Sequence, residues 1–475
     1  RGMGYLNAHV IRKERIRNNR LRLRYEVHPG DIYRVTHLEV DIQDSMLSQR
    51  LQEENAMPSL SEGMNFDLSV LDAERGRISS ALANKGYYRF NKDYIRFEVD
   101  TTIGHHQVDL RMKILPYHIT ASQDTILHSQ YSINKVSFLA DTTQSGRPFL
   151  RHKVLMETSR LEPGQIYRES DVQETYARMI RLGGVLGTNV RLYPASSDST
   201  GLDAVVQVSQ GKHNSFGVEV EGTNSAGDFG AALSASYQNR NVFRGGETFG
   251  VKLRGAFEAI KGLSGYQDQN YIEYSAETGF TFHGFRAPFI SRDFRRKVVA
   301  TSEVSLMYDS QDRPEFHRRV VTAAWKYRWA RPGKRLQHRV DLLDLNYVFM
   351  PWISSTFREL YLDDPENRNA ILRYNYENLF IMKWGYNMTY NSRSIRDGRT
   401  NYGTNGYIVR MGVESSGNLL YGLSKAGLSN INSMGQYTFF NIAYAQYVKA
   451  DFDYSKSFIF DKRNSLALHF GLGVA

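Results

Sequence analysis

The fold of this chain is decided by residues 214–258, which read NSFGVEVEGTNSAGDFGAALSASYQNRNVFRGGETFGVKLRGAFE. Within this stretch three runs alternate between apolar and polar residues, and short turns rich in Asn and Gly separate the runs. In the first run Phe216, Val218 and Val220 alternate with small or acidic residues. Successive side chains of a β-strand point to opposite faces, so this period of two predicts three consecutive strands with one apolar face.

The predicted strands are about ten residues long, which is enough for a tilted strand to cross a bilayer. In a soluble β-sandwich the apolar face would pack on a core, whereas in a membrane barrel it would face lipid and the polar face would line a wet lumen. The alternation does not separate these two folds. The number of strands and their aromatic content have to decide between them.

The alternation continues to the end of the chain and predicts about eleven strands in residues 212–475. Connections such as 331–334 are short, whereas 352–378 and 415–436 are long, and such unequal connections are typical of a membrane barrel. The phase of the alternation slips near Leu342, which predicts a β-bulge. Because eleven strands leave the sheet without a closing strand, we expect further strands beyond residue 475.

Composition favours a membrane barrel over a helical membrane protein. The chain contains 30 Tyr, 25 Phe and 4 Trp residues, and Tyr suits the boundary between lipid and water because its body is apolar and its tip polar. The mean hydropathy is -0.48, and no apolar run approaches the roughly 18 residues that a membrane helix needs. The absence of cysteine excludes disulfides, thiolate metal sites and a cysteine nucleophile.

The net charge of +10 indicates a generally basic surface. Basic residues are dispersed except for a cluster between Arg12 and Arg24, which we expect to be a solvated hairpin loop. No nucleic-acid-binding motif accompanies these charges, so no nucleic-acid partner is predicted. The chain begins Arg1-Gly2-Met3, and we expect it to be an internal piece of a longer protein.

Residues 1–211 are predicted to form soluble α+β domains. Residues 31–116 show the order β-α-α-β-β, the same order returns in 129–211, and residues 1–30 hold only the last part of such a unit. The elements expected in the first complete unit are a strand at 33–42, helices at 45–54 and 67–85, and strands at 94–99 and 108–114. A repeat of about 100 residues in the same element order indicates tandem domains, although two unrelated α/β domains would give a similar pattern.

Soluble α/β repeats followed by a long alternating sheet resemble the outer-membrane assembly factor superfamily of BamA and TamA type. In that superfamily POTRA domains of β-α-α-β-β order precede a sixteen-stranded barrel. The junction from Leu202–Val206 to Gly217–Gly222 resembles the last POTRA strand and the first barrel strand, and Tyr237–Glu247 resembles the first periplasmic turn. The chain looks most similar to the TamL-like branch of Bacteroidota. The superfamily's arginine-bearing lumen loop would follow the strand that ends near Val474.

The resemblance implies the following organisation. Residues 1–30 would be the C-terminal part of a POTRA domain, 31–116 a POTRA domain, 129–211 the last POTRA domain, and 212–475 the N-terminal part of an antiparallel transmembrane β-barrel with about eleven of an expected sixteen strands. The POTRA domains would lie in the periplasm and the barrel in the outer membrane of a Gram-negative bacterium. The expected partners are unfolded outer-membrane or secreted client proteins, the lipid bilayer and accessory envelope subunits, with no cofactor, no metal and no catalytic residue.

The resemblance also implies where clients would bind. A client strand adds to an exposed sheet edge by backbone hydrogen bonds. The candidate residues on client-binding edges are Tyr94, Ile95, Phe97, Val99, Asn189, Val190, Leu192 and Tyr193. The candidate residues of a strand bordering a lateral gate are Asn214, Phe216, Val218, Val220 and Gly222.

Three other functions compete with an assembly factor that inserts or exports client proteins. A two-partner-type secretion pore shares the architecture, and a passive porin or nutrient receptor would share the barrel but has no need of the soluble repeats. An enzyme is disfavoured because no phosphate loop, nucleophile elbow or zinc motif is present. Asp363–Asn367 lacks the spacing of an EF-hand, and His105-His106 is expected to be an ordinary turn between strands.

Overall fold

The computed structural model describes the chain from residue 2 to residue 475, with gaps at 18–19, 54–56, 119–124, 144–145, 197, 226–227, 261–268, 333–334, 363–375, 394, 397–398, 401–404, 429, 432–436, 440–441 and 462. The chain forms two compact units. The first comprises Arg1–Leu139, Ser159–Ala177 and Asn189–Gln207, and the second comprises Ala140–Thr158, Arg178–Thr188 and Val208–Ala475. None of the described helices is long and apolar enough to span a membrane.

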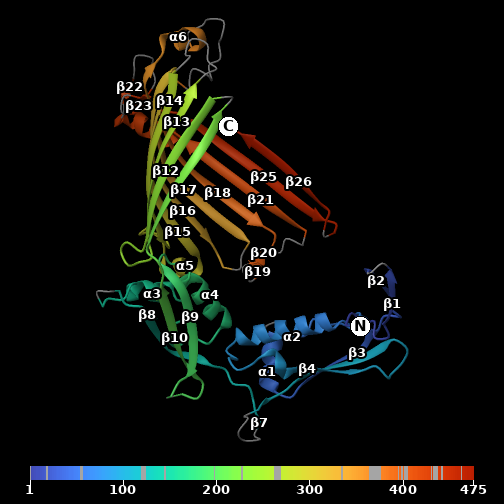
Figure 1. The fold of residues 1–475 in the computed structure, drawn as a ribbon. Helices are drawn as coiled ribbons and strands as arrows, with labels where there is room; N and C mark the ends of the chain where they lie inside the picture. Colours follow the sequence, from blue (N-terminus) through green and yellow to red (C-terminus); the bar gives the residue numbers. More distant parts are fainter. Residues whose placement is uncertain are drawn as a thin grey trace. The chain divides into compact units, whose positions relative to one another are not determined.

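The region 31–116 contains the predicted β-α-α-β-β order. Its elements are β3 (Arg34–Ile42), α1 (Ser45–Glu53), α2 (Leu68–Ala83), the 3-10 helix η1 (Lys92–Tyr94), β4 (Ile95–Asp100) and β5 (Gln107–Ile114). The strands form a sheet of order β3-β5-β4, in which β3 is parallel and β4 antiparallel to β5 (Figure 1). The α+β fold class is therefore confirmed for this region.

The fold of this domain follows from residues that begin and end α2 and from the apolar faces of the two helices. Asp67 caps α2, because its side chain accepts a hydrogen bond from the Ser69 amide over 2.8 Å. After the helix, Gly86 adopts a φ of 99°, a conformation that only glycine adopts readily. The apolar faces of both helices pack on the sheet. The buried residues of this core are Leu47, Leu51, Ile78, Leu82, Tyr87, Phe90, Ile95, Met112 and Ile114.

The basic cluster near the start of the chain is not a loop, and that expectation was wrong. β1 (His9–Arg17) and β2 (Arg20–His28) form a two-stranded antiparallel ribbon in which Lys13 lies opposite Arg24 and Arg15 opposite Arg22. The basic residues thus lie along paired strands, and in β2 Leu21, Leu23, Tyr25 and Val27 alternate with charged residues, a period of two that is typical of a strand.

The region 129–211 repeats the same element order. Its elements are β8 (Ser132–Ala140), α3 (His152–Thr158), α4 (Glu169–Met179), β9 (Val185–Pro194) and β10 (Gly201–Gln210). The strands form a sheet of order β8-β10-β9. The short strands β6 (Tyr117–His118) and β7 (Thr125–Ile126) pair with each other before it.

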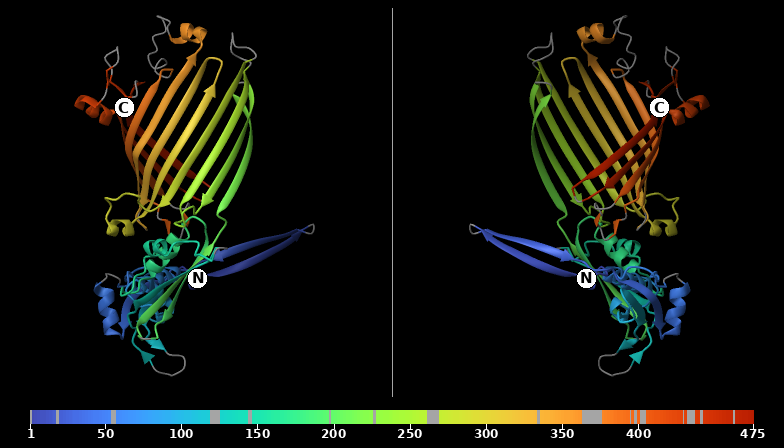
Figure 2. Two further views of the ribbon diagram at one scale, coloured as in Figure 1. Left: turned by 90° about the vertical axis from the view of Figure 1, so that its left-hand side faces the viewer. Right: turned by 90° about the vertical axis from the view of Figure 1, so that its right-hand side faces the viewer.

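The second unit is dominated by one antiparallel sheet of eleven strands, each bonded to its neighbours in chain order (Figure 2). The predicted strand number is confirmed. The strands are β11 (Asn214–Ser225), β12 (Asp228–Arg240), β13 (Thr248–Ile260), β14 (Gln269–His283), β15 (Val299–Asp312), β16 (Phe316–Ala330), β17 (Leu336–Ile353), β18 (Leu379–Asn391), β21 (Gly406–Ser416), β25 (Tyr447–Ile459) and β26 (Ser465–Val474).

The β-bulge predicted near Leu342 is present in β17. On the β16 side the register shifts so that Trp325 pairs with Leu343 and the next residue, Lys326, with Asp341. Leu342 is therefore the extra residue. A register shift lies at the same place on the β18 side, between Asp341 and Asp344.

The connections at the two ends of the sheet differ less than expected. One end carries two long connections. The first, 354–378, contains α6 (Ser355–Phe357) and the π-helix η2 (Arg358–Leu362). The second, 417–446, contains α8 (Asn418–Leu423), the π-helix η3 (Ser424–Leu428) and the short strands β22 (Asn430–Ile431), β23 (Tyr437–Phe439) and β24 (Ile442–Ala443). The opposite end also has structured connections, at 284–298 with α5 (Arg292–Lys297) and at 392–405 with β19 (Ile395–Arg396) and β20 (Arg399–Thr400). The expectation of short turns at this end holds for 241–247, 331–335 and 460–464.

Candidate functional site

The first candidate site is the free edge of β4. In the sheet β3-β5-β4, β4 is bonded to β5 on one side and to no described strand on the other. An edge strand leaves a row of N–H and C=O groups unpaired. Of the residues predicted for this edge, Ile95, Phe97 and Val99 lie on β4, whereas Tyr94 ends η1 directly before it.

The register with β5 determines which backbone groups face this edge. The Leu115 amide donates to the Tyr94 carbonyl over 2.8 Å, so Tyr94 belongs to a hydrogen-bonded pair. Bonded and non-bonded pairs alternate along an antiparallel ladder. The N–H and C=O groups of Ile95, Phe97 and Val99 therefore point away from β5 and toward the free edge.

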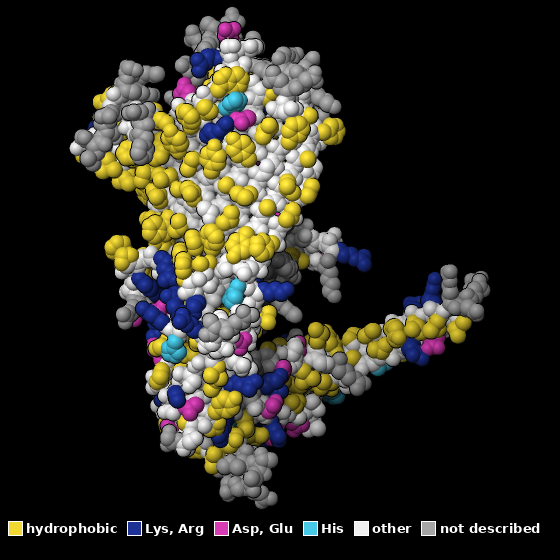
Figure 3. All heavy atoms as spheres, turned by 60° about the vertical axis from the view of Figure 1, so that its left-hand side comes forward, with side chains coloured by type: hydrophobic (Ala, Val, Ile, Leu, Met, Phe, Trp, Pro, Cys, Tyr) yellow, Lys and Arg dark blue, Asp and Glu magenta, His cyan; other side chains and the backbone are white. Residues whose placement is uncertain are grey.

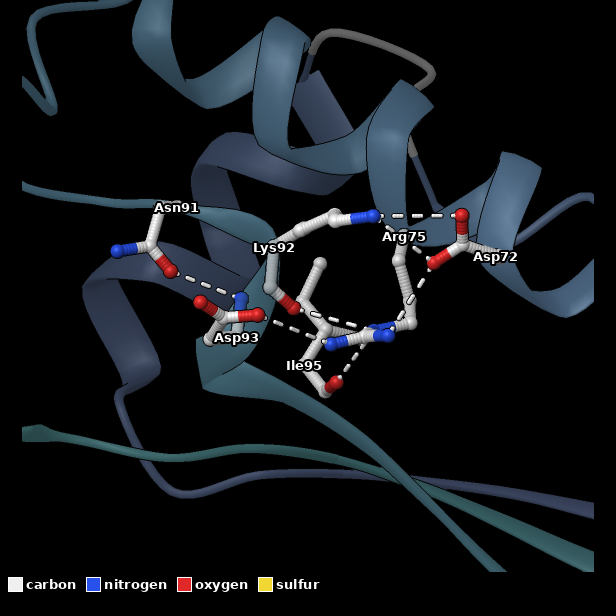
Figure 4. A network of polar contacts seen from close by, with 6 residues as sticks. All are labelled: Asp72, Arg75, Asn91, Lys92, Asp93 and Ile95. Carbon is white, nitrogen blue, oxygen red and sulfur yellow. Dashed lines mark hydrogen bonds and ion pairs between the residues drawn. The ribbon is translucent and has the colours of Figure 1, made fainter.

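Arg75 forms a hydrogen bond with one of these edge carbonyl oxygens. Its Nε donates to the carbonyl oxygen of Ile95 over 2.9 Å and to that of Lys92 over 3.1 Å. Asp72 and Asp93 hold the guanidinium through contacts of 3.2 and 3.4 Å, and Figure 4 shows this network. The open stretch of the β4 edge consequently begins only after Ile95.

The exposed face of β4 carries charge that is locally paired. Glu98 accepts a hydrogen bond from Lys113 on β5 over 2.8 Å, and this bond lowers the pKa of the Glu98 carboxyl. Asp100 accepts a hydrogen bond from the backbone N–H of Thr102 over 2.8 Å, which likewise lowers its pKa. Both carboxylates are therefore ionised at neutral pH and border the open stretch of the edge.

β9 is the corresponding edge of the sheet β8-β10-β9. All four predicted residues, Asn189, Val190, Leu192 and Tyr193, lie on it. Asn189 and Tyr193 are exposed, and Val190 and Leu192 are half-buried. The strand thus presents one packed and one open face beside its free edge.

The strand predicted to border a lateral gate is β11, which forms one edge of the eleven-stranded sheet. The Arg240 amide donates to the His213 carbonyl over 2.8 Å, so the next pair along the ladder is non-bonded. Every second residue of β11 therefore directs its backbone groups to the open edge. These residues are the predicted Asn214, Phe216, Val218, Val220 and Gly222.

β26 forms the opposite edge of the eleven-stranded sheet among the described strands. The Phe460 amide donates to the Asn464 carbonyl over 3.1 Å. By the same alternation, the open backbone groups of β26 belong to Ser465, Ala467, His469, Gly471 and Gly473. Every residue of β26 is exposed on both faces.

The polar face of the sheet carries ion pairs that connect β11 to β13 across the strand between them. Arg254 on β13 contacts Glu221 at 3.3 Å and Glu273 on β14 at 3.0 Å. Lys252 contacts Glu219 at 3.7 Å. The edge strand is therefore held through its polar side chains as well as through its backbone pairing with β12.

The opposite face of the sheet is apolar and exposed, and Figure 3 shows its hydrophobic side chains as a broad band with few charges. Phe216 and Val220 on β11, for example, are 80% and 79% exposed. Exposed apolar surface of this extent marks an interaction with lipid or protein.

An aromatic belt runs along this apolar face at the end where β12 leads into β13. Neighbouring rings lie between 4.7 Å (Phe249–Phe280) and 6.1 Å (Phe243–Phe280) apart. The belt consists of Phe243, Phe249, Phe280, Phe282, Phe285, Tyr327, Trp329, His338, Tyr386, Tyr390, Tyr407 and Tyr454. Rings of this kind gather at the boundary between hydrocarbon and headgroups around membrane barrels.

The turn between β12 and β13 is built around a buried carboxylate. Glu247 is 2% exposed on its side chain and contacts Arg151 at 3.3 Å and Arg286 at 3.6 Å. Its second oxygen accepts a hydrogen bond from the Gly245 amide over 2.9 Å. Asn241 supports the same turn, since its side-chain oxygen accepts from Gly246 over 2.8 Å. Glu247 thereby links the turn, the 284–298 connection and the segment around residue 151.

The described residues contain no group of His, Asp or Glu side chains arranged to hold a metal ion. His106 pairs with Asp31 at 3.3 Å and lies edge-on to Tyr33, so it serves packing in a turn as expected. The segment Asp363–Asn367 lies outside the described residues.

The chain is similar to several solved structures. BamA from Haemophilus ducreyi lacking POTRA domains 1-3 is similar with a TM-score of 0.51 and 13% identity, over 93% of this chain and 70% of that chain. BamA POTRA3-5 from Haemophilus influenzae is similar at 15% identity over 44% of this chain and 75% of that chain, with a TM-score of 0.29. CdiB from Acinetobacter baumannii is similar at 9% identity over 94% and 87% of the two chains, with a TM-score of 0.30.

No protein-family model and no curated protein sequence matches the chain. The similarity to the Haemophilus ducreyi protein concerns the fold. It agrees with the sheet orders given above, and the predicted fold class, POTRA domains followed by an antiparallel transmembrane β-barrel, is confirmed.

Proposed function

We propose that this chain is an outer-membrane protein of a Gram-negative bacterium that inserts client proteins into the outer membrane or exports them across it. Its POTRA domains would lie in the periplasm and receive the clients. The observation that carries this proposal is the combination, in one chain, of soluble domains with free strand edges and a sheet whose apolar face is exposed. A porin needs only the second of these features.

The free edges suit unfolded clients because backbone groups recognise backbone groups. A client strand pairing with Phe97 and Val99 uses its own N–H and C=O groups, so its affinity depends little on its side chains. This explains how one edge could serve clients of different sequence. No bond is made or broken, and we propose that the protein is not an enzyme.

The edge of β11 would perform the second step. Its open backbone groups and its exposed apolar side chains, Phe216, Val218 and Val220, belong to the same residues. A client strand that pairs there therefore enters the sheet with its own apolar side chains on the lipid-facing side. The strand thus borders a lateral gate in this proposal.

Photo-crosslinking in cells tests the proposal. Crosslinkers at Phe97, Val99, Val218 and Gly222 are expected to trap newly made outer-membrane proteins. A crosslinker at Val70, which is exposed on the helix α2 and not on a strand, is the control. Equal trapping at Val70 and Phe97, or none at any edge position, would contradict client binding at these edges.

Depletion separates the proposed function from a two-partner-type secretion pore. Loss of many barrel proteins from the outer membrane is expected for an assembly factor. Loss of one secreted protein would instead indicate a dedicated pore. Solute-selective conductance without either loss would indicate a passive porin or nutrient receptor.

We also propose that the chain belongs to the superfamily of BamA and TamA, in the TamL-like branch, and that accessory envelope subunits bind it. The support is the element order together with the turn Tyr237–Glu247, whose buried Glu247 and positive φ at Gly246 (76°) give the family-like segment a defined structure. Mild detergent extraction followed by mass spectrometry would test for accessory subunits.

A further inference from the structure

The connection between β14 and β15, residues 284–298, folds back onto the outer, apolar face of the sheet. Phe285 and Val298 are buried against Ala300 and Tyr327, and Phe294 packs against the same cluster. Because Ala300 and Tyr327 belong to the apolar face of β15 and β16, the connection covers that face rather than the polar one. This placement could not be read from the connection's length.

Hydrogen bonds between side chains of the sheet and the backbone of the connection fix it at this place. Ser302 Oγ donates to the Gly284 carbonyl over 2.8 Å and accepts from the Arg286 amide over 2.9 Å. The Tyr327 hydroxyl donates to the Arg286 carbonyl over 3.3 Å. The connection is therefore a defined ledge beside the aromatic belt, to which Phe285 and Tyr327 themselves belong.

One apolar side chain on this ledge has no contact with the core. Phe289 is 93% exposed, the highest value among the large hydrophobic side chains of the described residues, although its neighbour Ile290 packs on the buried cluster. Burying such a side chain is favourable because it removes a large apolar surface from water. A rigid segment that presents a Phe in this way is shaped for an apolar medium or an apolar partner.

The same ledge is strongly basic. α5 has the sequence RDFRRK, with three basic residues in its last turn. Arg295 is exposed and donates to the Ala287 carbonyl, and Lys297 is exposed with no carboxylate partner among the described residues. Figure 3 shows dark-blue side chains gathered at the lower end of the hydrophobic band. Basic residues next to an apolar belt are placed to meet lipid phosphates.

We propose that residues 284–298 form a membrane-interface anchor that binds glycerophospholipids of the periplasmic leaflet. Phe289 inserts beside the acyl chains, and Arg295 and Lys297 contact the headgroup phosphates. The anchor is continuous with the aromatic belt, and its charge is complementary to phosphate, which favours lipid over a second copy of this basic chain. The anchor would hold this end of the barrel at one depth in the membrane. The inference rests on the proposed membrane location of the barrel.

Spin labelling of the full chain in vesicles of phosphatidylethanolamine and phosphatidylglycerol tests the anchor. The sequence has no cysteine, so Phe289→Cys, Val304→Cys and Arg463→Cys each create a single labelling site. Val304 lies on the apolar face of β15, and Arg463 lies in the short turn between β25 and β26 at the same end of the sheet. Collision rates with oxygen report lipid, and collision rates with a nickel chelate report water.

The ratio of oxygen to nickel collision rates is expected to be several-fold higher at 289 than at 463, and to fall when Lys297→Glu is added. A ratio at 289 equal to that at 463, with 304 in lipid, would overturn the anchor while leaving the membrane barrel intact. Protection of 289 from both reagents would overturn it in favour of a protein partner. Water exposure at both 289 and 304 would overturn the membrane location itself.

Discussion

Among single residues, Glu74 shows how charge is accommodated inside the soluble domain. It lies on α2 at 4% exposure, and its carboxylate accepts hydrogen bonds from Arg77 over 2.7 Å and from the Ser59 amide over 2.8 Å. Burial alone would raise the pKa of Glu74. The hydrogen bonds from Arg77 and Ser59 outweigh it, so the pKa lies below that of an ordinary glutamate.

This lowered pKa predicts a pH dependence of stability. A carboxyl with a lower pKa in the folded than in the unfolded state stabilises the fold above its unfolded pKa, and the stabilisation is lost as the pH falls through the folded pKa. We expect the protection of the α2 amides from hydrogen exchange, relative to the intrinsic exchange rate at each pH, to fall below about pH 4.3, the pKa of a free glutamate. Glu74→Gln should weaken this dependence, whereas a substitution of the more exposed Glu53 on α1, Glu53→Gln, should keep it. An unchanged slope in Glu74→Gln would contradict the assignment.

Glu247 supplies a second prediction at this scale. Glu247→Gln removes the charge that pairs with Arg151 and Arg286, but both arginines are about half exposed and regain water. We therefore expect a loss of about 1–2 kcal/mol in the free energy of unfolding, measured by denaturant titration of the protein in vesicles. Glu219→Gln, at a 65% exposed site, is the control and should cost less. Equal costs would show that the buried turn gains nothing from its charge.

At the scale of elements, the backbone groups of successive β4 residues face β5 and the open edge in turn. Single substitutions can therefore affect client binding without affecting the stability of the domain, or the reverse. The Val99 N–H faces the open edge, so Val99→Pro removes a donor that β5 does not use. The Glu98 N–H faces β5, so Glu98→Pro removes a ladder bond and is expected to cost about 3 kcal/mol. Val99→Pro should abolish client crosslinking at Phe97 while leaving the domain folded. Undiminished crosslinking in Val99→Pro would mean that clients bind elsewhere.

The free edges also differ in how far they are open. On β4 the Arg75 guanidinium covers the Ile95 carbonyl, which shortens the edge that a client can use. On β11 the open groups run from Asn214 to Gly222 without such a cover among the described contacts. Longer pairing is therefore available on the barrel strand than on the POTRA strand.

For the whole molecule, the division of the sheet into an apolar and a polar face predicts that an arginine substitution has opposite effects on stability at neighbouring positions. Leu306 on β15 is 51% exposed on the apolar face, whereas Ser305 lies on the polar face. Leu306→Arg is expected to lower the free energy of unfolding in vesicles by about 2–4 kcal/mol, because it places a charge in hydrocarbon. Ser305→Arg should be tolerated, because its side chain reaches the wet side. Equal tolerance of both would contradict the assignment of the two faces.

The sequence by itself determined the strands, their faces and the order of the domains. The period of two in β11, β12 and β13, the phase slip at Leu342 and the β-α-α-β-β order are all encoded by residues close to one another along the chain. These features depend on which neighbours alternate, and local alternation survives folding unchanged. That β4 and β9 are sheet edges was not encoded in this way, because it depends on the third strand of each α+β sheet pairing between the other two.

Only the tertiary structure decided which groups on those edges are open and what the connections cover. The direction of each N–H on β4 depends on its register with β5, and the cover on Ile95 comes from Arg75, twenty residues earlier on another element. The connection 284–298 packs on the apolar face because Phe285 and Phe294 find Tyr327 there. Such contacts join residues distant in the chain, and no periodicity along the sequence records them.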